Sequence, residues 1–311
     1  MRAICPKCAS THNRKKGTRY SPSFEGNVQR WLCHSCGKHF QTPIDSPKQD
    51  LPKILLLDIE TALMEVYVWG LYKQYIPHTN IIKDKDGNEK SWFVLSWAAK
   101  WLFDDNVQSD TLIPKEAKSR NDKRILQSIW KLLDEADIII GHNIDRFDTR
   151  KLNARFIDND IKPPSPFRSI DTLKISRKEF AFVSYKQDFL TKHFKLEEKL
   201  KTEFQLWVDC MHGDQARLDE MAEYNRYDVM GLEQVYLKLR PYIKNHPNLG
   251  VLMDMDVCPN CGCEYLDETD SVYFTTANKF PVYRCQGCKT PYIRGKKNVN
   301  QDNTNMRSVA K

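Results

Sequence analysis

Two carboxylates that follow an apolar run have a spacing that suggests chemistry. Residues 53–63 read KILLLDIETAL, and the Leu and Ile run predicts a buried strand over 53–61. Side chains alternate across a strand, so Asp58 and Glu60 point to one side and Ile59 to the other. Buried carboxylates repel each other and are costly without a partner. The pair therefore needs a compensating positive charge.

Two more carboxylates and a tyrosine occur in positions that could join this pair. The segment DIIIG predicts a second buried strand over 137–141, and Asp148 follows it where a helix at 147–159 is expected to begin. Tyr224 and Asp228 lie four residues apart within a helix predicted over 214–239. That spacing places the phenol and the carboxylate on one helical face, a turn apart.

The three segments together resemble a known superfamily. DIET, HNIDRFD and YNRYD are similar to the exonuclease motifs of the DEDD (DnaQ-like) 3′→5′ exonucleases, and they occur here in order along residues 53–245. The tyrosine of YNRYD resembles that of the DEDDy branch, which includes the proofreading domains of family B DNA polymerases. The resemblance implies an α/β, RNase H-like fold, with a mixed sheet flanked by helices.

The resemblance also implies a set of metal ligands and a reaction. The implied ligands of two Mg²⁺ or Mn²⁺ ions are Asp58, Glu60, Asp148 and Asp228. These ions prefer oxygen ligands, and two of them about 3.5–4 Å apart can clamp a scissile phosphate. The implied reaction releases nucleoside 5′-monophosphates from the 3′ end of DNA. Tyr224 would orient the attacking water, because a phenol with a pKa near about 10 is a poor base at neutral pH.

Each residue also has a plainer interpretation. An Asp-x-Glu at a strand end can be a solvated loop edge, and a Tyr and an Asp four apart are often only neighbours on a helix surface; their joint occurrence favours the metal site. Asn143 either contacts the substrate backbone or forms a turn. For His142 we favour a simple strand-end position. We expect Asp171 to cap the following helix rather than bind metal.

Eight of the ten cysteines form CxxC pairs at the two ends of the chain. The segments ICPKC…RWLCHSCGKHFQTP and VCPNCG…VYRCQGCKTPYIR resemble each other and form an internal repeat. Pairs about two dozen residues apart predict two zinc ribbons with four cysteine ligands each, in which four thiolates leave no open position for catalysis. The predicted zinc ligands are Cys5, Cys8, Cys33, Cys36, Cys258, Cys261, Cys285 and Cys288. Cys263 is a spare thiol, and Cys210 is expected to be an ordinary buried one.

The formal charge of +7 is confined to one end of the chain. Residues 1–43 contain eight Lys and Arg against one acid, which accounts for the whole excess, while residues 254–294 carry a net charge of −2. Cations neutralise phosphates and aromatic rings stack on bases. The predicted nucleic-acid contacts are Arg14, Lys15, Lys16, Arg19 and Arg30, interleaved with Tyr20, Phe24, Trp31 and Phe40. The second ribbon is expected to brace the core or to bind a separate replication or repair protein.

The resulting domain organisation has five parts. We expect a basic zinc ribbon at 1–43, a linker at 44–52, the exonuclease domain at 53–250, a second ribbon at 254–294 and a disordered tail at 295–311. Further strands near 91–103 and 107–112 should extend the sheet as a meander, and further helices are predicted at 121–135 and 184–194.

Composition limits the cellular setting. No apolar run reaches the roughly eighteen residues of a membrane helix, the first residues lack a signal peptide, and the cysteine pattern favours metal binding over disulfides. We therefore expect a cytoplasmic protein without membrane partners, in a prokaryotic or phage-infected cell. No polymerase-sized segment follows the core, so any polymerase it serves would be a separate chain.

Two rival functions remain. A 3′→5′ exoribonuclease of the same fold would use the same carboxylates and differ only in contacts to the 2′-hydroxyl. A zinc-ribbon nucleic-acid-binding protein could keep the nuclease core only as a scaffold, although four intact carboxylates argue against this.

Overall fold

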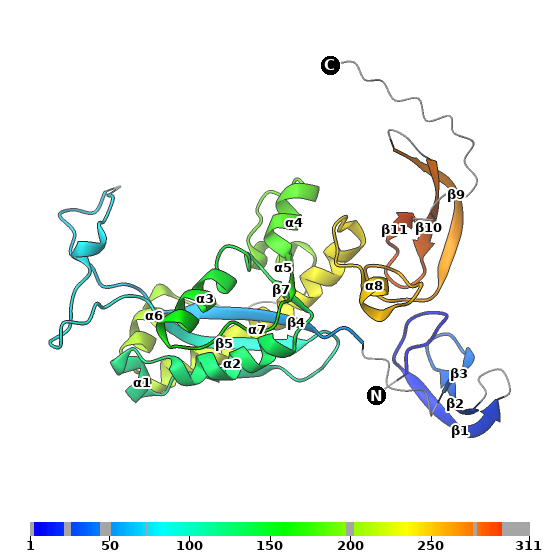
Figure 1. Ribbon diagram of the computed structural model, residues 1–311, viewed down its shortest axis with the longest axis horizontal. Coiled ribbons are helices and arrows are strands. Elements are labelled where there is room, and N and C mark those ends of the chain that lie inside the picture. The colour runs from blue at the N-terminus through cyan, green and yellow to red at the C-terminus, as the bar shows by residue number, and fades with distance from the viewer. Residues whose placement is uncertain are drawn as a thin grey trace, which may run out of the picture. The chain divides into compact units, whose positions relative to one another are not determined.

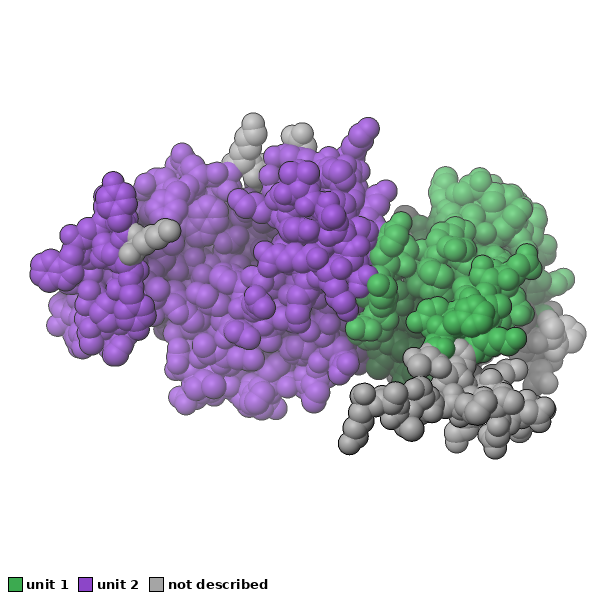
Figure 2. Space-filling model, turned by 90° about the horizontal axis from the view of Figure 1, so that it is seen from above, with its two compact units in different colours: residues 1–51, 240–311 green, residues 52–239 purple. Residues whose placement is uncertain are grey.

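The computed structural model describes residues 3–21, 26–43, 51–72, 74–196, 202–275 and 279–293. The chain divides into two compact units, one formed by residues 1–51 and 240–311 and the other by residues 52–239 (Figure 2). Most of the expected linker at 44–52 and the whole expected tail at 295–311 lie outside the described residues. Among the helices that are described, none is long and apolar enough to cross a membrane.

The unit formed by residues 52–239 is built on a five-stranded mixed sheet with the strand order β6-β5-β4-β7-β8 (Figure 1). The strands are β4 (Ile54–Thr61), β5 (Val94–Trp101), β6 (Gln108–Thr111), β7 (Ile138–Gly141) and β8 (Arg168–Asp171). The first three pair antiparallel, which confirms the predicted meander, and β7 and β8 extend the sheet in parallel with β4.

Seven α-helices lie in the part of this unit that the structure describes. They are α1 (Pro114–Ser119), α2 (Lys123–Glu135), α3 (Asp148–Asp158), α4 (Thr172–Glu179), α5 (Gln187–His193), α6 (Phe204–Met211) and α7 (Gln215–Leu239). The helices predicted at 121–135, 147–159, 184–194 and 214–239 are present. The arrangement confirms the predicted α/β class with a mixed sheet flanked by helices.

Apolar side chains bury the strands that carry the carboxylates. The first four residues of β4 are all buried, after which the burial alternates, so that Ile59 faces the core while Asp58 and Glu60 are half-buried. Helix α2 contributes a face of Ile125, Ile129 and Leu133, at the spacing that the sequence predicts. Helix α7 places Met221 and Leu218 in the same core. Burial of this kind fixes the strand on which the first two carboxylates lie.

A buried aspartate connects three elements of this unit. Asp122 Oδ2 accepts from the backbone N–H of Val94 at 2.9 Å and from Arg155 Nε at 2.8 Å. Arg155 Nη2 donates to the other oxygen at 2.7 Å. Because Arg155 belongs to α3, this network attaches α3 to β5 and to the start of α2, and it thereby positions the first residue of α3, Asp148.

A second buried ion pair attaches α7 to the sheet. Lys100 on β5 pairs with Glu233 on α7, and their side chains are 8% and 14% exposed. Glu233 Oε1 also accepts from the backbone N–H of Phe103 at 2.9 Å. The pair therefore fixes the helix that carries Tyr224 and Asp228.

The other unit contains two small antiparallel sheets of three strands. One consists of β1 (Asn13–Ser21), β2 (Gly26–Cys33) and β3 (His39–Pro43), and the other of β9 (Leu266–Phe274), β10 (Lys279–Cys285) and β11 (Pro291–Ile293). Both have their strands in chain order, which parallels the internal repeat in the sequence. The short helix α8 (Leu249–Met253) also belongs to this unit, and Asn260 Nδ2 donates to the carbonyls of Arg240 and Ile243.

Replacing Lys100 by Met should leave the Glu233 carboxylate buried without its partner. Breaking one side of a buried pair costs about 3–5 kcal/mol of the free energy of unfolding, whereas replacing both sides is much less harmful. We therefore expect Lys100→Met to be far less stable to denaturant than the double variant Lys100→Met/Glu233→Gln.

The control is Lys53→Met, which removes a pair with Glu135 whose side chains are 54% and 53% exposed. An exposed pair contributes at most about 1 kcal/mol. Equal destabilisation of the Lys53 and Lys100 variants, measured by urea unfolding of the full chain, would show that the buried pair does not hold α7.

Candidate active site and metal clusters

Three of the predicted carboxylates meet where β4 faces α7. Asp58 and Glu60 come from β4 and Asp228 from α7, and one carboxylate oxygen of each lies within 4.8 Å of the other two. Asp228 is buried, and its backbone carbonyl accepts from Gln187 Nε2 at 2.8 Å. Asp228 is far along the chain from Asp58 and Glu60, so the fold brings it to the pair.

Asp148, the fourth predicted ligand, lies at the first position of α3 and is buried. Its Oδ1 accepts from the backbone N–H of Ile59 at 3.2 Å, which places it beside the strand segment that carries Asp58 and Glu60. Burial raises the pKa of Asp148 well above its usual range, and the neighbouring charge of Asp58 raises it further. This crowding of carboxylates is the arrangement that a bound cation would relieve.

A tight turn between β7 and α3 places Asp148 beside β4. A Cβ at Gly141 would lie 2.6 Å from the Cβ of Ile144, so only glycine fits where β7 ends. Asn143 has a φ of +76°, a left-handed conformation that Asn tolerates, and its N–H donates to Asp171 Oδ1 at 3.0 Å. The turn-forming role of Asn143 is therefore observed, while its contact with a substrate stays a prediction.

The residues next to this turn have structural partners. Asp171 accepts from the backbone N–H groups of Leu173 and Lys174, which confirms the predicted helix cap. The two ring nitrogens of His142 lie 2.9 Å from Thr172 Oγ1 and 2.8 Å from the carbonyl of Tyr185. The imidazole thus connects the strand end to the segments that follow it.

Tyr224 lies one helical turn before Asp228 and is 8% exposed. Its ring meets Trp207 edge-on at a centroid distance of 5.9 Å. Burial raises the pKa of Tyr224 above its usual value, and the charges of Glu60 and Asp58 raise it further. The phenol therefore stays protonated at neutral pH.

Trp207 on α6 is a site residue that the sequence analysis missed. Its Nε1–H donates to Glu60 Oε2 at 2.9 Å. The segment FQLWVDCM contains no motif, and the two residues are 147 positions apart, so no local signal points to this contact. Trp207 fixes the orientation of one carboxylate of the cluster.

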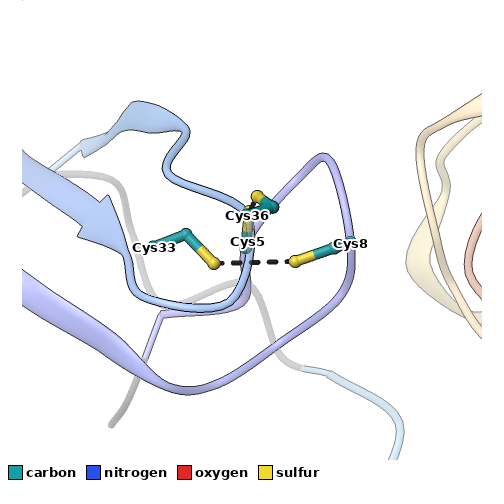
Figure 3. Close-up of side chains that lie close together, drawn as sticks. All are labelled: Cys5, Cys8, Cys33 and Cys36. Atoms are coloured by element: carbon teal, nitrogen blue, oxygen red, sulfur yellow. Dashed lines mark hydrogen bonds between the residues drawn. The ribbon is translucent and has the colours of Figure 1, made fainter.

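The cysteine pairs form two compact clusters, of which Figure 3 shows the first. In that cluster the Sγ–Sγ distances are 3.6 Å for Cys5 and Cys36 and 3.5 Å for Cys8 and Cys33. In the second they are 3.6 Å for Cys258 and Cys288 and 3.5 Å for Cys261 and Cys285. A disulfide would need about 2.05 Å, whereas sulfurs bound at about 2.3 Å to a tetrahedral zinc lie less than about 4 Å apart. Both clusters can therefore hold a metal ion.

One backbone turn is used four times to build these clusters. The residue after the second cysteine of each CxxC pair has a positive φ and donates its N–H to the carbonyl of the first cysteine. These residues are Ala9, Gly37, Gly262 and Lys289. Two of them are not glycine, so the turn is kept even where the left-handed backbone is unfavourable for the side chain.

The five predicted nucleic-acid contacts of the first ribbon, which are Arg14, Lys15, Lys16, Arg19 and Arg30, are all exposed. The expectation that its aromatic rings stack on bases is wrong for Trp31 and Phe40. They are 7% and 9% exposed, lie against each other at 6.3 Å, and form the ribbon's core with Cys5 and Cys33. So small a sheet has few other apolar side chains to bury. Phe24 and the Tyr20 side chain lie outside what the structure describes.

Comparison with known proteins agrees with the fold of the larger unit. Residues 98–240 match the family model described as the RNase_H superfamily. That range includes Asp148, Tyr224 and Asp228 and begins after Asp58 and Glu60. Together with the mixed sheet, this match agrees with an RNase H-like fold.

Among solved structures, a similar chain is the family B DNA polymerase from the hyperthermophilic archaeon Pyrobaculum calidifontis. The sequence identity is 16% and the TM-score 0.44, and the match covers 65% of this chain and 26% of the polymerase chain. This chain therefore matches about a quarter of the polymerase. No curated protein matches the sequence.

Replacing Trp207 by Phe should weaken metal binding at the carboxylate cluster. The variant keeps an aromatic ring against Tyr224 but removes the N–H donor that orients Glu60. Loss of such a partner of a ligand typically costs about 10- to 100-fold in metal affinity, which Mn²⁺ titration calorimetry would measure. Trp130→Phe is the matched control, because it removes an indole bond to the carbonyl of Lys162 instead. Equal Mn²⁺ affinity of the two variants would contradict the role of Trp207.

Elemental analysis of the purified chain should find about two zinc ions. Cys5→Ser and Cys258→Ser should each lower this to about one, since each removes a ligand from one cluster. Cys210→Ala should keep both ions, because Cys210 is buried in the core of the larger unit. A wild-type chain without bound metal would show that the clusters have another role.

Proposed function

We propose that the protein is a metal-dependent 3′→5′ exonuclease that hydrolyses DNA to nucleoside 5′-monophosphates. The observation that carries this proposal is the approach of the Asp58, Glu60 and Asp228 carboxylates within 4.8 Å. Asp148, bonded to the backbone between the first two, and Tyr224, one turn from the third, complete the set. The RNase H-like fold supports a phosphodiester hydrolase.

The donor set suits hard divalent cations. Asp58, Glu60, Asp148 and Asp228 would hold two Mg²⁺ or Mn²⁺ ions, because carboxylate oxygens are the ligands that these ions prefer. When bound, such a pair lowers the pKa of a water molecule and stabilises the departing 3′ oxygen.

The protein's own groups position the reacting atoms. The protonated Tyr224 hydroxyl would hydrogen-bond the attacking water and orient it. Trp207 holds Glu60, and the backbone N–H of Ile59 holds Asp148, so two of the four carboxylates have fixed oxygens before substrate arrives. Preorganisation of this kind removes the need to rearrange charges during the reaction.

The two terminal sheets would divide the remaining tasks. Zinc in each four-cysteine cluster would hold its sheet together, as such sites do in domains with little core. The first ribbon, with its exposed cations, would bind phosphates of the substrate. The second, with its net charge of −2, would brace the core or bind a separate replication or repair protein.

The test is digestion of matched single- and double-stranded DNA and RNA. With Mg²⁺ or Mn²⁺, a 5′-labelled DNA strand should shorten to a ladder, a 3′-labelled strand should release labelled mononucleotide at once, and EDTA should stop both reactions. Faster digestion of RNA would replace the DNA assignment by an exoribonuclease. Binding without any digestion would favour the scaffold alternative.

Replacing Asp58 or Asp228 by Asn should abolish digestion. Each change removes one anionic ligand without altering volume. Added Mn²⁺ should raise the unfolding temperature of the wild type, since a ligand at about 100 times its Kd stabilises by about 2.7 kcal/mol, and this effect should disappear in the variants. Asp145→Asn is the control: it removes an aspartate charge from the HNIDRFD segment, but Asp145 pairs with Lys174. A near-normal rate in either ligand variant would exclude the two-metal mechanism.

Tyr224→Phe should reduce the rate of digestion without eliminating it. The ring keeps its contact with Trp207, and only the hydroxyl that orients water is lost. One positioned group of this type contributes about 10²–10⁴-fold, which single-turnover kinetics would measure. An unchanged rate would mean that the tyrosine only packs the helix.

A further inference from the structure

The segment between β4 and β5 forms an arm, defined here as residues 63–92. Its base is ordered by backbone hydrogen bonds, from Ala62 N–H to the Phe93 carbonyl at 2.8 Å and from Glu65 N–H to the Lys90 carbonyl at 3.1 Å. Isolated bridges join Val66 to Ile81 and Lys83 to Glu89. The arm thus has a defined stem.

Ion pairs attach this stem to the body of the unit. The Glu65 carboxylate pairs with Arg120, at the end of α1, and with Lys90 at 2.7 Å. Arg120 Nη1 also donates to the carbonyl of Ser91 at 2.7 Å. Both ends of the arm are therefore held beside the sheet.

The tip of the arm presents large side chains to solvent. Trp69 is 99% exposed, Leu71 96%, Tyr72 91% and Tyr75 93%, and Tyr67 is also exposed. In Figure 1 this segment is the cyan loop that projects beyond the sheet and helices of its unit. Single exposed apolar residues are ordinary, but a group of this size within a few residues marks a binding surface.

The length of the chain limits how far this surface can lie from the carboxylates. The first hydrogen bond of the stem is made by Ala62, two residues after Glu60, and Trp69 follows Glu60 by nine residues. Nine extended residues span at most about 30 Å. Trp69 therefore lies no farther than about 30 Å from Glu60, and Tyr75, fifteen residues after Glu60, no farther than about 50 Å. A single strand of several nucleotides with its 3′ end at the cluster can span such distances.

We propose that the exposed rings of the arm, Trp69, Tyr72 and Tyr75, stack on the unpaired bases of a single-stranded nucleic acid whose 3′ end lies at the carboxylates. This inference rests on the proposed exonuclease function and specifies its substrate as a single strand. Flat aromatic faces stack on any base, and each such contact strengthens binding by about 5- to 150-fold. In a duplex the bases stack on one another and leave only the terminal pair accessible.

The charge of the arm favours stacking over phosphate binding. Its four lysines, at positions 73, 83, 85 and 90, are balanced by Glu65, Asp84, Asp86 and Glu89. Phosphate contacts produce salt-dependent affinity, with a slope of about 0.7 per contact on single strands. Affinity due to the arm should therefore change little with salt, in contrast to affinity due to the first ribbon.

The experiment measures binding without cleavage. The full chain carrying Asp228→Asn, in EDTA, is titrated against a fluorescent single-stranded DNA and its blunt duplex over a salt series. Adding Trp69→Ala, Tyr72→Ala and Tyr75→Ala should weaken single-strand binding by at least about tenfold at every salt concentration. The salt slope and the duplex affinity should not change.

Two matched controls separate the contributions. Ile157→Ala with Val183→Ala removes side chains that are 78% and 95% exposed elsewhere in the same unit, and it should not affect binding. Replacing Arg14, Lys15 and Lys16 by Ala should flatten the salt slope instead. All the substituted side chains of the arm are exposed, so the variant should fold, which circular dichroism would verify.

Equal single-strand affinity with and without the arm's rings would overturn the proposal and point to a protein as the occupant of the arm. An equal loss on single strand and duplex would overturn the single-strand assignment. If the wild type digests nothing but the rings still determine single-strand affinity, the exonuclease proposal fails while the stacking surface stands.

Discussion

The mutual repulsion of four carboxylates is the constraint on which the rest of the larger unit depends. Asp58, Glu60 and Asp228 approach within 4.8 Å, and Asp148 is buried beside them. Without a cation, each carboxylate disfavours the charge of the others. The scaffold must therefore resist a force that would separate β4, α3 and α7. The apolar first half of β4 and the core face of α7 supply that resistance.

The buried charged pairs of this unit serve the same end. The pair of Asp122 and Arg155 fixes α3, and the pair of Lys100 and Glu233 fixes α7. On each helix the paired residue lies one to two turns after the carboxylate of the cluster. Buried pairs of this kind add little net stability, because desolvation offsets their attraction. Their value here is geometric. Each ion pair holds one helix in a single position against the sheet, and the carboxylate on that helix is thereby held in a single position as well.

The sequence predicts the helices and strands that have an apolar run or a periodic apolar pattern. β4 and β7 are apolar runs and α7 has a helical apolar pattern, and the carboxylates lie on or shortly after these elements. The sequence analysis did not predict β8. Its four residues, RSID, contain only one apolar side chain and so lack the apolar run of a buried strand. Trp207 was not predicted either, since its bond to Glu60 depends on how α6 packs and not on any neighbour in sequence. Local sequence patterns therefore predict individual helices and strands, whereas the contacts between them can be read only from the folded structure.

The aromatic residues show why composition alone misplaces a binding surface. Trp31 and Phe40 lie among the cations of the first ribbon, yet that small sheet uses them as its core. The arm is held by backbone hydrogen bonds and ion pairs at its stem, and none of its described residues is buried in a core. Trp69, Tyr72 and Tyr75 therefore stay in solvent. Whether a ring is available to a ligand depends on whether its own domain needs it for packing. In the first ribbon the cations are exposed and Trp31 and Phe40 are buried, whereas Trp69, Tyr72 and Tyr75 of the arm are exposed. Under the proposed function, the ribbon would contact phosphates and the arm would contact bases.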